Sequence, residues 1–421
     1  MQRRTFLTSL AAAFPMLAAS NEKLKISAVE IWRIEGRRPP QAESHGYRVS
    51  SPQYIYDELR PGLVRQGNAA QGGPMSLFYV KIKTDGGPEG FYGPVFANVC
   101  AVVDQQLGPF LIGKDPLAGE TLWEEMYRSN HHSQGFMFQA ISAVDNTLWD
   151  LRGRHYGVPV YRLLGGPTRP AVEVYASCID LSVDPEQLPG LARRYQQQGY
   201  QYQKWFMAYG PGDGPEGMRK NVEVVRILRE TLGENAPFMI DAFMSWDLNY
   251  ALEFAHKVER YAPHWLEEPF LPDSIQSFVE LRKGTTIPIA SGEHLYGRWA
   301  AGKYLRTGAV GVLQTDVDWC GGISESLKIC AIASEYGVPL IPHGDCLHPA
   351  LHLIASQSPN VCPLAEYMVN RLHAGQWKYY FEKNPLVPVK GKITLSDRPG
   401  FGIELDPSRV EKQTKVTSSW S

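Results

Sequence analysis

The chain has 421 residues, of which 43% are hydrophobic and 20% charged, and its formal net charge is −2 at pH 7. This length exceeds that of one small domain and suits a barrel with an additional domain. The near-neutral charge, without long charge runs, excludes an extended nucleic-acid-binding surface and a polybasic membrane patch. The six cysteines form no CxxC pair, so they indicate neither a zinc site nor a disulfide framework.

The first twenty residues differ from the rest of the chain. Arg3 and Arg4 precede Phe6 and a short apolar run that ends at Ala19. This pattern resembles a bacterial twin-arginine export signal, and the alternative is the basic start of a cytosolic protein. We expect a signal peptide over residues 1–20 and a periplasmic or exported mature protein, or a cytoplasmic one if the signal does not function. The apolar run is too short to span a bilayer, so we expect no membrane association after signal removal.

Residues 21–165 predict an α+β domain without a regular strand–helix repeat. Residues 24–35 and 77–83 alternate between apolar and polar side chains, as strands do, and helical patterns run through residues 98–158. A tail at residues 385–421, punctuated by Pro and Gly in its first half, is expected to pack back on this domain.

A long connection, residues 36–75, joins the two predicted strands. It is rich in Pro, Gly and Ser, and a connection of this length in a compact enzyme is typical of a lid or binding loop. Its His45, Tyr56 and Arg60 are candidates to bind the distal end of a substrate, and the alternative, which local sequence favours for any one of them, is an ordinary surface residue.

From Ala171 onward, strands and helices alternate. Strands are expected at residues 171–178 and 200–207, and six further apolar stretches each end in a side chain that can act as an acid, a base or a ligand. These side chains are Asp241, Glu267, Glu293, Asp316, His343 and Glu366. Their intervals of 23 to 27 residues match one strand–helix unit of a (β/α)8 barrel, whose C-terminal strand ends share one mouth. The sequence therefore predicts a barrel enzyme over residues 166–384.

Asp241, Glu267 and Glu293 end three successive predicted strands. A single strand-end acid would usually face solvent, but three carboxylates brought together in a dry site require a cation to ionise fully. All-oxygen ligands suit Mg²⁺, with Mn²⁺ as the alternative, rather than Zn²⁺. Alternation sends either Glu267 or Glu268 away from the mouth, and we assign the ligand to Glu267 because Glu268-Pro269 resembles the start of a loop.

His343 and Asp316 end neighbouring predicted strands, so the carboxylate should orient the imidazole as a general base. Lys204 could donate to a substrate carboxylate or a developing enolate, or simply extend from the barrel rim. Glu366 is a candidate acid or hydrogen-bond partner, with a buried structural carboxylate as the alternative. His294 could contact the substrate or its leaving group. A metal beside such a base suits proton removal next to a carboxylate, through a metal-stabilised enediolate.

Taken together, these residues resemble the enolase superfamily, within its mandelate racemase/muconate lactonizing enzyme group. The resemblance covers residues 24–406 and rests on the metal-ligand motifs Asp241, Glu267-Glu268-Pro269 and Gly292-Glu293. It implies a modified (β/α)7β TIM-type barrel under an α+β capping domain. It also implies one Mg²⁺ per subunit, the His343–Asp316 dyad as the base, and a homo-oligomer.

Within that group, the Pro342-His343-Gly344 motif and residues 314–322 resemble acid-sugar dehydratases, rhamnonate dehydratases in particular. Racemases of the group carry a Lys-x-Lys pair where this chain has Lys204-Trp205-Phe206. Phe206 cannot act as a base, so one-base elimination is favoured over two-base racemisation.

We therefore predict a Mg²⁺-dependent hydro-lyase that removes the C2 proton of an acid sugar, a rhamnonate-like aldonate. Elimination of the 3-hydroxyl, protonated by His343 in the analogy, would give a 2-keto-3-deoxy acid. The nearest alternative is a cycloisomerase or epimerase that uses the same enediolate. A non-catalytic sugar-acid-binding protein is a further alternative, and the complete set of catalytic positions argues against it. The expected partner is a small acid sugar, and no nucleic acid.

Overall fold

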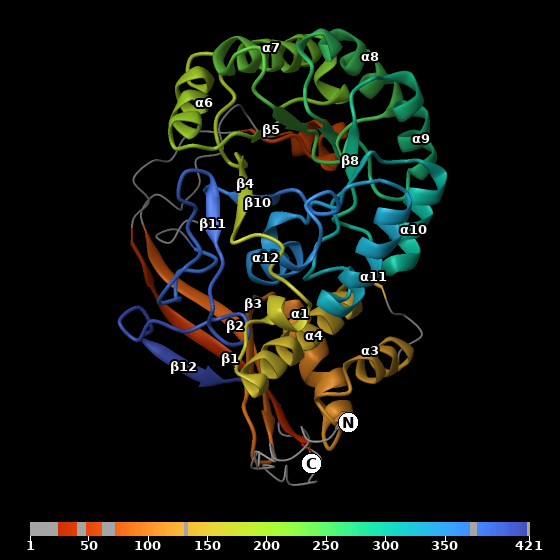
Figure 1. Cartoon of the computed structure of the whole chain (residues 1–421). Helices are drawn as coiled ribbons and strands as arrows, with labels where there is room; N and C mark the ends of the chain where they lie inside the picture. Colours follow the sequence, from red (N-terminus) through yellow and green to blue (C-terminus); the bar gives the residue numbers. More distant parts are fainter. Residues whose placement is uncertain (1–23, 40–47, 61–71, 130–133, 371–376, 419–421) are drawn as a thin grey trace, which may run out of the picture.

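The computed structural model describes residues 24–39, 48–60, 72–129, 134–370 and 377–418. The predicted signal peptide and His45 lie outside the described residues. Within them the chain forms a cap and a barrel, and Figure 1 shows the barrel helices arranged in an arc around the strands. No helix in these ranges is long and apolar enough to cross a membrane.

The cap combines a four-stranded sheet with helices that share its core. Its elements are β1 (Ile26–Arg38), β2 (Gly73–Thr84), β3 (Gly90–Val95), α1 (Ala97–Val102), the short π-helix η4 (Val103–Leu107), α2 (Gly108–Leu111), α3 (Gly119–Arg128), α4 (Phe136–Tyr156), α5 (Val160–Leu163) and β12 (Lys412–Lys415). The strand order is β12-β1-β2-β3, with each neighbouring pair antiparallel. The link between β1 and β2 is shorter than expected because both strands extend into it, and β3 is a strand that the sequence does not predict. Two short 3-10 helices, η1 (Pro52–Ile55) and η2 (Asp57–Leu59), lie in that link.

The barrel alternates short parallel strands with helices, as predicted. Its elements are β4 (Ala171–Ser177), α6 (Leu188–Gln197), β5 (Gln203–Phe206), η5 (Pro211–Asp213), α7 (Gly214–Leu232), β6 (Phe238–Asp241), α8 (Leu248–Val258), η6 (Glu259–Tyr261), β7 (Leu266–Glu267), α9 (Ile275–Gly284), β8 (Ile289–Ser291), α10 (Gly297–Thr307), β9 (Val312–Leu313), α11 (Gly322–Glu335), η7 (Gly344–Cys346), α12 (Leu347–Ser356), β10 (Ala365–Met368) and β11 (Lys392–Thr394). Helix ends follow local chemistry: the Asp247 side chain accepts from Tyr250 N at the start of α8, and Gly308 at φ +68° ends α10. The expected helices at residues 216–232 and 297–307 correspond to α7 and α10.

The barrel sheet closes through one irregular segment. Its parallel strands have the order β10-β4-β5-β6-β7-β8-β9, and β11 lies outside this order and pairs with β4 in the antiparallel direction. Where the seventh barrel strand is expected, Leu340 forms a single bridge to Leu313 and donates its backbone N–H to Val361 O at 2.8 Å. This segment fills the gap between β9 and β10. The C-terminal tail joins both domains, because β11 pairs with β4 and β12 pairs with β1.

An apolar layer fills the barrel interior, and each strand of the barrel, or the residue next to it, contributes one side chain. The layer consists of Tyr175, Met239, Trp265, Ala290, Val312, Ile341 and Leu364, with Tyr202 packed against them. Successive side chains of a strand point to opposite faces. The residue two positions later on each strand therefore also faces the interior, nearer the C-terminal edge of the barrel.

Buried polar contacts of α3 and α4 with the start of α11 attach the cap to the barrel. Asp145 accepts hydrogen bonds from Ser324 N and Oγ at 2.9 and 2.7 Å, and Trp123 Nε1 donates to Gly321 O at 2.7 Å. Gly322 has a φ of +81°, and a Cβ there would lie 2.5 Å from Asp145 Oδ2. Helices α4 and α11 therefore approach this closely only because a glycine stands at the contact.

Candidate active site

A ring of polar side chains lies one step above the apolar layer, at the C-terminal edge of the barrel. Its positions are Ser177, Lys204, Asp241, Glu267, Gly292, Gln314, His343 and Glu366. Every side chain in the ring is buried. Gly292 has a φ of +136°, and the chain turns there so that Glu293 follows at the mouth. Four of the six predicted strand-end residues thus belong to one ring; Glu293 follows its ring position Gly292 directly, and Asp316 lies two residues after its ring position Gln314.

The predicted dyad is present. His343 Nδ1 lies 2.7 Å from Asp316 Oδ2, and the other oxygen of Asp316 accepts from Asp318 N at 2.6 Å. On its opposite side, His343 Nε2 lies 3.5 Å from Glu293 Oε2. Burial alone would lower the pKa of His343, but the carboxylates of Glu293, Asp316 and Glu366 raise it well above 6.5. The imidazole is thus oriented by one carboxylate and faces another.

Lys204 is a buried ammonium among carboxylates rather than a rim lysine. Its Nζ lies 3.1 Å from Asp241 Oδ2 and 2.9 Å from Glu366 Oε1, and it also donates to Glu267. The second oxygen of Glu366 accepts from Gly344 N at 2.8 Å. Although burial opposes ionisation, Lys204 and His343 lower the pKa of Glu366 to about 2. Glu366 is therefore a carboxylate that contacts both the ring and the His343 turn.

Both acids of the Glu267-Glu268 pair stay at the mouth, on different levels. Glu267 lies in the ring, where its Oε2 accepts from Trp265 Nε1 and Gln314 Nε2, each at 2.8 Å. Glu268 has a φ of +41°, and this turn breaks the strand alternation. Its carboxylate accepts from Ser291 Oγ at 3.2 Å.

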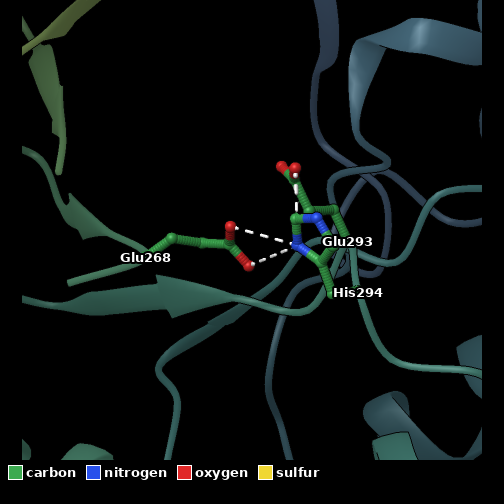
Figure 2. Close-up of side chains that lie close together, drawn as sticks. All are labelled: Glu268, Glu293 and His294. Atoms are coloured by element: carbon green, nitrogen blue, oxygen red, sulfur yellow. Dashed lines mark hydrogen bonds and ion pairs between the residues drawn. The ribbon is translucent and has the colours of Figure 1, made fainter. Parts of the chain in front are cut away.

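His294 packs between two of these carboxylates. Figure 2 shows its imidazole between Glu268 and Glu293, with Nδ1 at 3.3 Å from Glu268 Oε2 and 3.6 Å from Glu293 Oε1. One ligand atom from each of the three lies within 4.8 Å of the others, a spacing that could hold a cation. Burial would lower the pKa of His294, but the hydrogen bond to Glu268 and the charge of Glu293 raise it to about 9. The Trp319 ring contacts both His294 and His343, with centroids 5.4 and 5.1 Å apart.

The donor set fits a hard divalent cation. Burial raises the pKa of Asp241 to about 6 and the pKa values of Glu267 and Glu293 to about 8, although Lys204 or His343 opposes the shift in each case. Glu268 adds its charge to the repulsion that raises the pKa of Asp241 and Glu293. Carboxylates that repel one another in a buried site are the oxygen donors that Mg²⁺ and Mn²⁺ prefer.

The predicted substrate-binding residues are placed less centrally. The Arg60 guanidinium donates to Gly212 O, in the turn after β5, and pairs with Asp57 in its own segment. It therefore joins these two turns. The Tyr56 side chain is exposed. Sequence reasoning did not single out Ser177, Gln314 or Trp319. The first two could have been found, because each lies two residues after an apolar interior position, whereas Trp319 follows the dyad in a loop without a local signal.

Two family models match the chain. The enolase C-terminal domain-like family matches residues 187–409, and the mandelate racemase/muconate lactonizing enzyme N-terminal domain matches residues 71–165. A protein of Caldivirga maquilingensis is 33% identical over 412 residues, which cover 95% of this chain and 99% of that protein. The L-rhamnonate dehydratase of Saccharopolyspora erythraea is 31% identical over 377 residues, covering 87% and 92% of the two chains.

Solved structures are similar over nearly the whole chain. Rhamnonate dehydratase from Gibberella zeae complexed with Mg aligns with a TM-score of 0.78 and 29% identity, covering 93% of this chain and 97% of that chain. The 3,6-anhydro-D-galactonate cycloisomerase from Zobellia galactanivorans aligns with a TM-score of 0.71 and 28% identity, covering 92% and 100%. These likenesses confirm the predicted TIM-type barrel with an N-terminal cap.

Proposed function

This chain belongs to the enolase superfamily, within its mandelate racemase/muconate lactonizing enzyme group, and from this premise we propose that it dehydrates an acid sugar. Its similarity to dehydratases over almost the whole chain indicates that it is an enzyme of the hydro-lyase class. The proposed substrate is a rhamnonate-like aldonate, and the proposed product is its 2-keto-3-deoxy acid. The observation that carries the proposal is the His343–Asp316 contact beside a cluster of buried carboxylates.

The cation proposed for this site is Mg²⁺, one per subunit, with Mn²⁺ as the alternative. Asp241, Glu267 and Glu293 would hold it, and the Mg complex of the Gibberella zeae structure supports a divalent ion in this family. When bound, such an ion draws electrons from the substrate's carboxylate and so acidifies the neighbouring C–H. Glu268 and His294 lie beside Glu293 and would shape the approach to that side of the site.

His343 is the proposed base. In the neutral form of the ring, Asp316 accepts the Nδ1 proton, and Nε2 is then the nitrogen that takes the C2 proton of the substrate. The carboxylate of Asp316 also stabilises the imidazolium that this transfer creates. The electron pair left at C2 moves into the carboxylate to give the enediolate. It then returns to form the C2–C3 double bond as the C3–O bond breaks.

The departing hydroxyl needs a proton, and the His343 imidazolium carries the one just removed. The product of this step is an enol, which becomes the 2-keto-3-deoxy acid by tautomerisation, with loss of one water overall. Lys204, whose ammonium contacts Glu366 in the ring, would stabilise negative charge on the substrate's carboxylate end. Phe206 packs against Phe243 with ring centroids 6.2 Å apart, so an apolar residue stands where a second base would be needed for racemisation.

Cycloisomerisation through the same enediolate is the second candidate. It is favoured by one observation, the 28% identity to the Zobellia galactanivorans cycloisomerase over 92% of this chain. The two reactions separate by product, because ring opening or closure retains the elements of water that dehydration removes. Both begin with the proton transfer to His343, so a base variant alone does not distinguish them.

The deciding experiment incubates purified protein and Mg²⁺ with a library of acid sugars and follows 2-keto acid as its semicarbazone. A hit among 6-deoxy or six-carbon aldonates supports dehydration if mass spectrometry shows a product about 18 mass units lighter than the substrate, the mass of one water. A product of unchanged mass that has lost its C2 hydrogen to solvent would instead support cycloisomerisation or epimerisation. No change of any library member by a cation-loaded protein would reject the proposed substrate class.

We also propose that residues 1–20 direct export and that the protein assembles as a homo-oligomer. The pattern around Arg3 and Arg4 supports the first proposal. N-terminal sequencing of protein from a twin-arginine-competent host tests it, and a chain that keeps Met1 in the cytoplasm would reject it. Light scattering of the mature protein tests the second proposal, and a monomeric mass would reject it.

A further inference from the structure

The segment formed by residues 48–60 packs against the C-terminal end of β5. Ser50 is fully buried, and its backbone N–H donates to Met207 O at 2.8 Å. Met207 N in turn donates to Asp241 O, also at 2.8 Å. The segment is therefore joined by two consecutive hydrogen bonds to the backbone of a proposed metal ligand.

A buried ion pair fixes this segment to the turn that follows β5. Arg48 Nη2 lies 2.5 Å from Asp213 Oδ1, and the two side chains are only 10% and 12% exposed. The Arg48 guanidinium also lies over the rings of Tyr209 and Tyr54, at 4.8 and 5.7 Å from their centroids. A planar guanidinium stacked on aromatic rings and bonded to a carboxylate is held in one orientation.

The turn itself is built to receive the segment. Asp213 Oδ2 accepts from Gly210 N at 3.0 Å, which fixes the carboxylate toward Arg48. A Cβ on Gly212 would lie 2.7 Å from Tyr54 O, so the segment passes close to the turn backbone. At the other end of the segment, Arg60 donates to Gly212 O. Both ends of residues 48–60 thus meet the same turn.

This ion pair differs from the surface pairs on the adjacent helix. Arg226 and Glu230 of α7 lie 2.7 Å apart, but their side chains are 41% and 59% exposed. Exposed pairs of that kind contribute little to stability, whereas breaking one partner of a buried pair leaves an uncompensated charge. Loss of either Arg48 or Asp213 would therefore leave a buried charge without its partner and weaken the attachment of the segment.

We propose that Arg48 and Asp213 are positioning residues that hold residues 48–60 against the β5 edge of the active-site mouth and thereby set substrate affinity. The inference rests on the proposed acid-sugar chemistry for its kinetic part only. Neither residue touches the His343–Asp316 dyad, so the chemical step proceeds unchanged once substrate is bound. The pair acts through the Ser50–Met207 hydrogen bond on the backbone next to Asp241.

The test is a double-mutant cycle of Arg48→Met, Asp213→Asn and the combination, with Arg48→Lys as the conservative variant. Asn at position 213 keeps an oxygen that can accept from Gly210 N, so the turn is retained. The matched control is Arg226→Met with Glu230→Gln, an exposed pair on α7. Hydrogen exchange of the full-length protein is measured across residues 48–60, and KM and kcat are measured on the aldonate found in the library screen.

Each single variant should raise KM about tenfold, because residues 48–60 are no longer held in place. It should change kcat less than about twofold, because the proposed base His343 is unaffected. The same variants should speed exchange at Ser50 and Tyr54 about tenfold or more, since their amides donate to Met207 O and Ser51 O. The double variant should be no worse than the worse single variant, which shows that the two residues act as one unit. Arg48→Lys should recover part of both effects, and the α7 control should change neither.

An equal fall of kcat in all variants, or additive effects in the double variant, would overturn the inference. Unchanged exchange at Ser50 in Arg48→Met would also overturn it, whatever the kinetics. If the wild-type protein converts no acid sugar, the proposed function has failed by itself. The exchange data still decide whether the pair holds the segment.

Discussion

His343 Nδ1 lies 2.7 Å from Asp316 Oδ2, while Nε2 of the same ring lies 3.5 Å from Glu293 Oε2. The first contact fixes the tautomer and the orientation of the ring. The second places the reactive nitrogen beside a proposed metal ligand. The imidazole of His343 therefore lies between Asp316, which follows β9, and Glu293, which follows the neighbouring strand β8.

Replacement of His343 by Asn should abolish turnover and spare cation binding. The amide cannot accept the C2 proton, so we expect kcat to fall about 10³-fold or more, as for loss of a general base. Semicarbazide assays give the rate, and titration calorimetry gives the Mg²⁺ affinity. His256→Asn, which alters an exposed histidine on α8, is the control and should behave as wild type. Turnover retained by the His343 variant would show that another group is the base.

Glu267 and Glu268 can be separated by their effect on cation affinity. If Glu267 is the ligand, Glu267→Gln should weaken Mg²⁺ binding about a hundredfold, while Glu268→Gln should change it no more than about threefold. The comparison matters because Glu267 already accepts from Trp265 and Gln314, whereas Glu268 faces Glu293 through His294. The reverse result would move the ligand to Glu268, in the set with Glu293 and His294.

Much of this site could be predicted from sequence, because a barrel converts strand spacing into convergence. Asp241, Glu267, His343 and Glu366 each lie two residues after a buried apolar residue, and one structural rule places all four in the ring. That rule does not apply to Glu268. Its φ of +41° belongs to a turn, and strand alternation does not describe a residue outside the strand.

Contacts between distant segments could not be predicted in the same way. Arg48 and Asp213 are separated by 165 positions, and neither lies in a periodic element that would indicate their meeting. The role of Lys204 was left open for a related reason. A lysine at a barrel edge can extend to solvent or turn inward, and only the buried carboxylates of three other strands decide between the two.

Lys204 should stabilise the cation-free protein. Its ammonium contacts Asp241, Glu267 and Glu366, so Lys204→Met leaves three buried carboxylates without it. We expect a loss of about 3–5 kcal/mol in the free energy of unfolding with EDTA present. Excess Mg²⁺ should restore much of that loss, because the ion binds the folded state. Lys220→Met, at a lysine of α7 whose side chain is 42% exposed, is the control. An equal loss with and without Mg²⁺ would contradict a cation site among these carboxylates.

Asp145 makes the attachment of the cap to the barrel sensitive to pH. Burial raises its pKa from 3.8 to about 6, against the opposing effects of Arg152, the Ser324 hydrogen bonds and Lys328. The folded protein therefore binds this proton more tightly than the unfolded chain does. The stability that the protonated carboxyl contributes is complete below pH 3.8 and is lost as the pH rises through about 6.

Asp145→Asn removes this titration and keeps an oxygen that can accept from Ser324 Oγ. It loses the acceptor for Ser324 N, at a cost of about 1 kcal/mol that does not depend on pH. We expect the unfolding free energy of the variant, relative to wild type, to rise by about 3 kcal/mol from below pH 4 to above pH 6. Urea unfolding across this range measures it, with Glu335→Gln on the exposed side of α11 as the control. A constant difference at all pH values would show that Asp145 keeps its ordinary pKa in the folded protein.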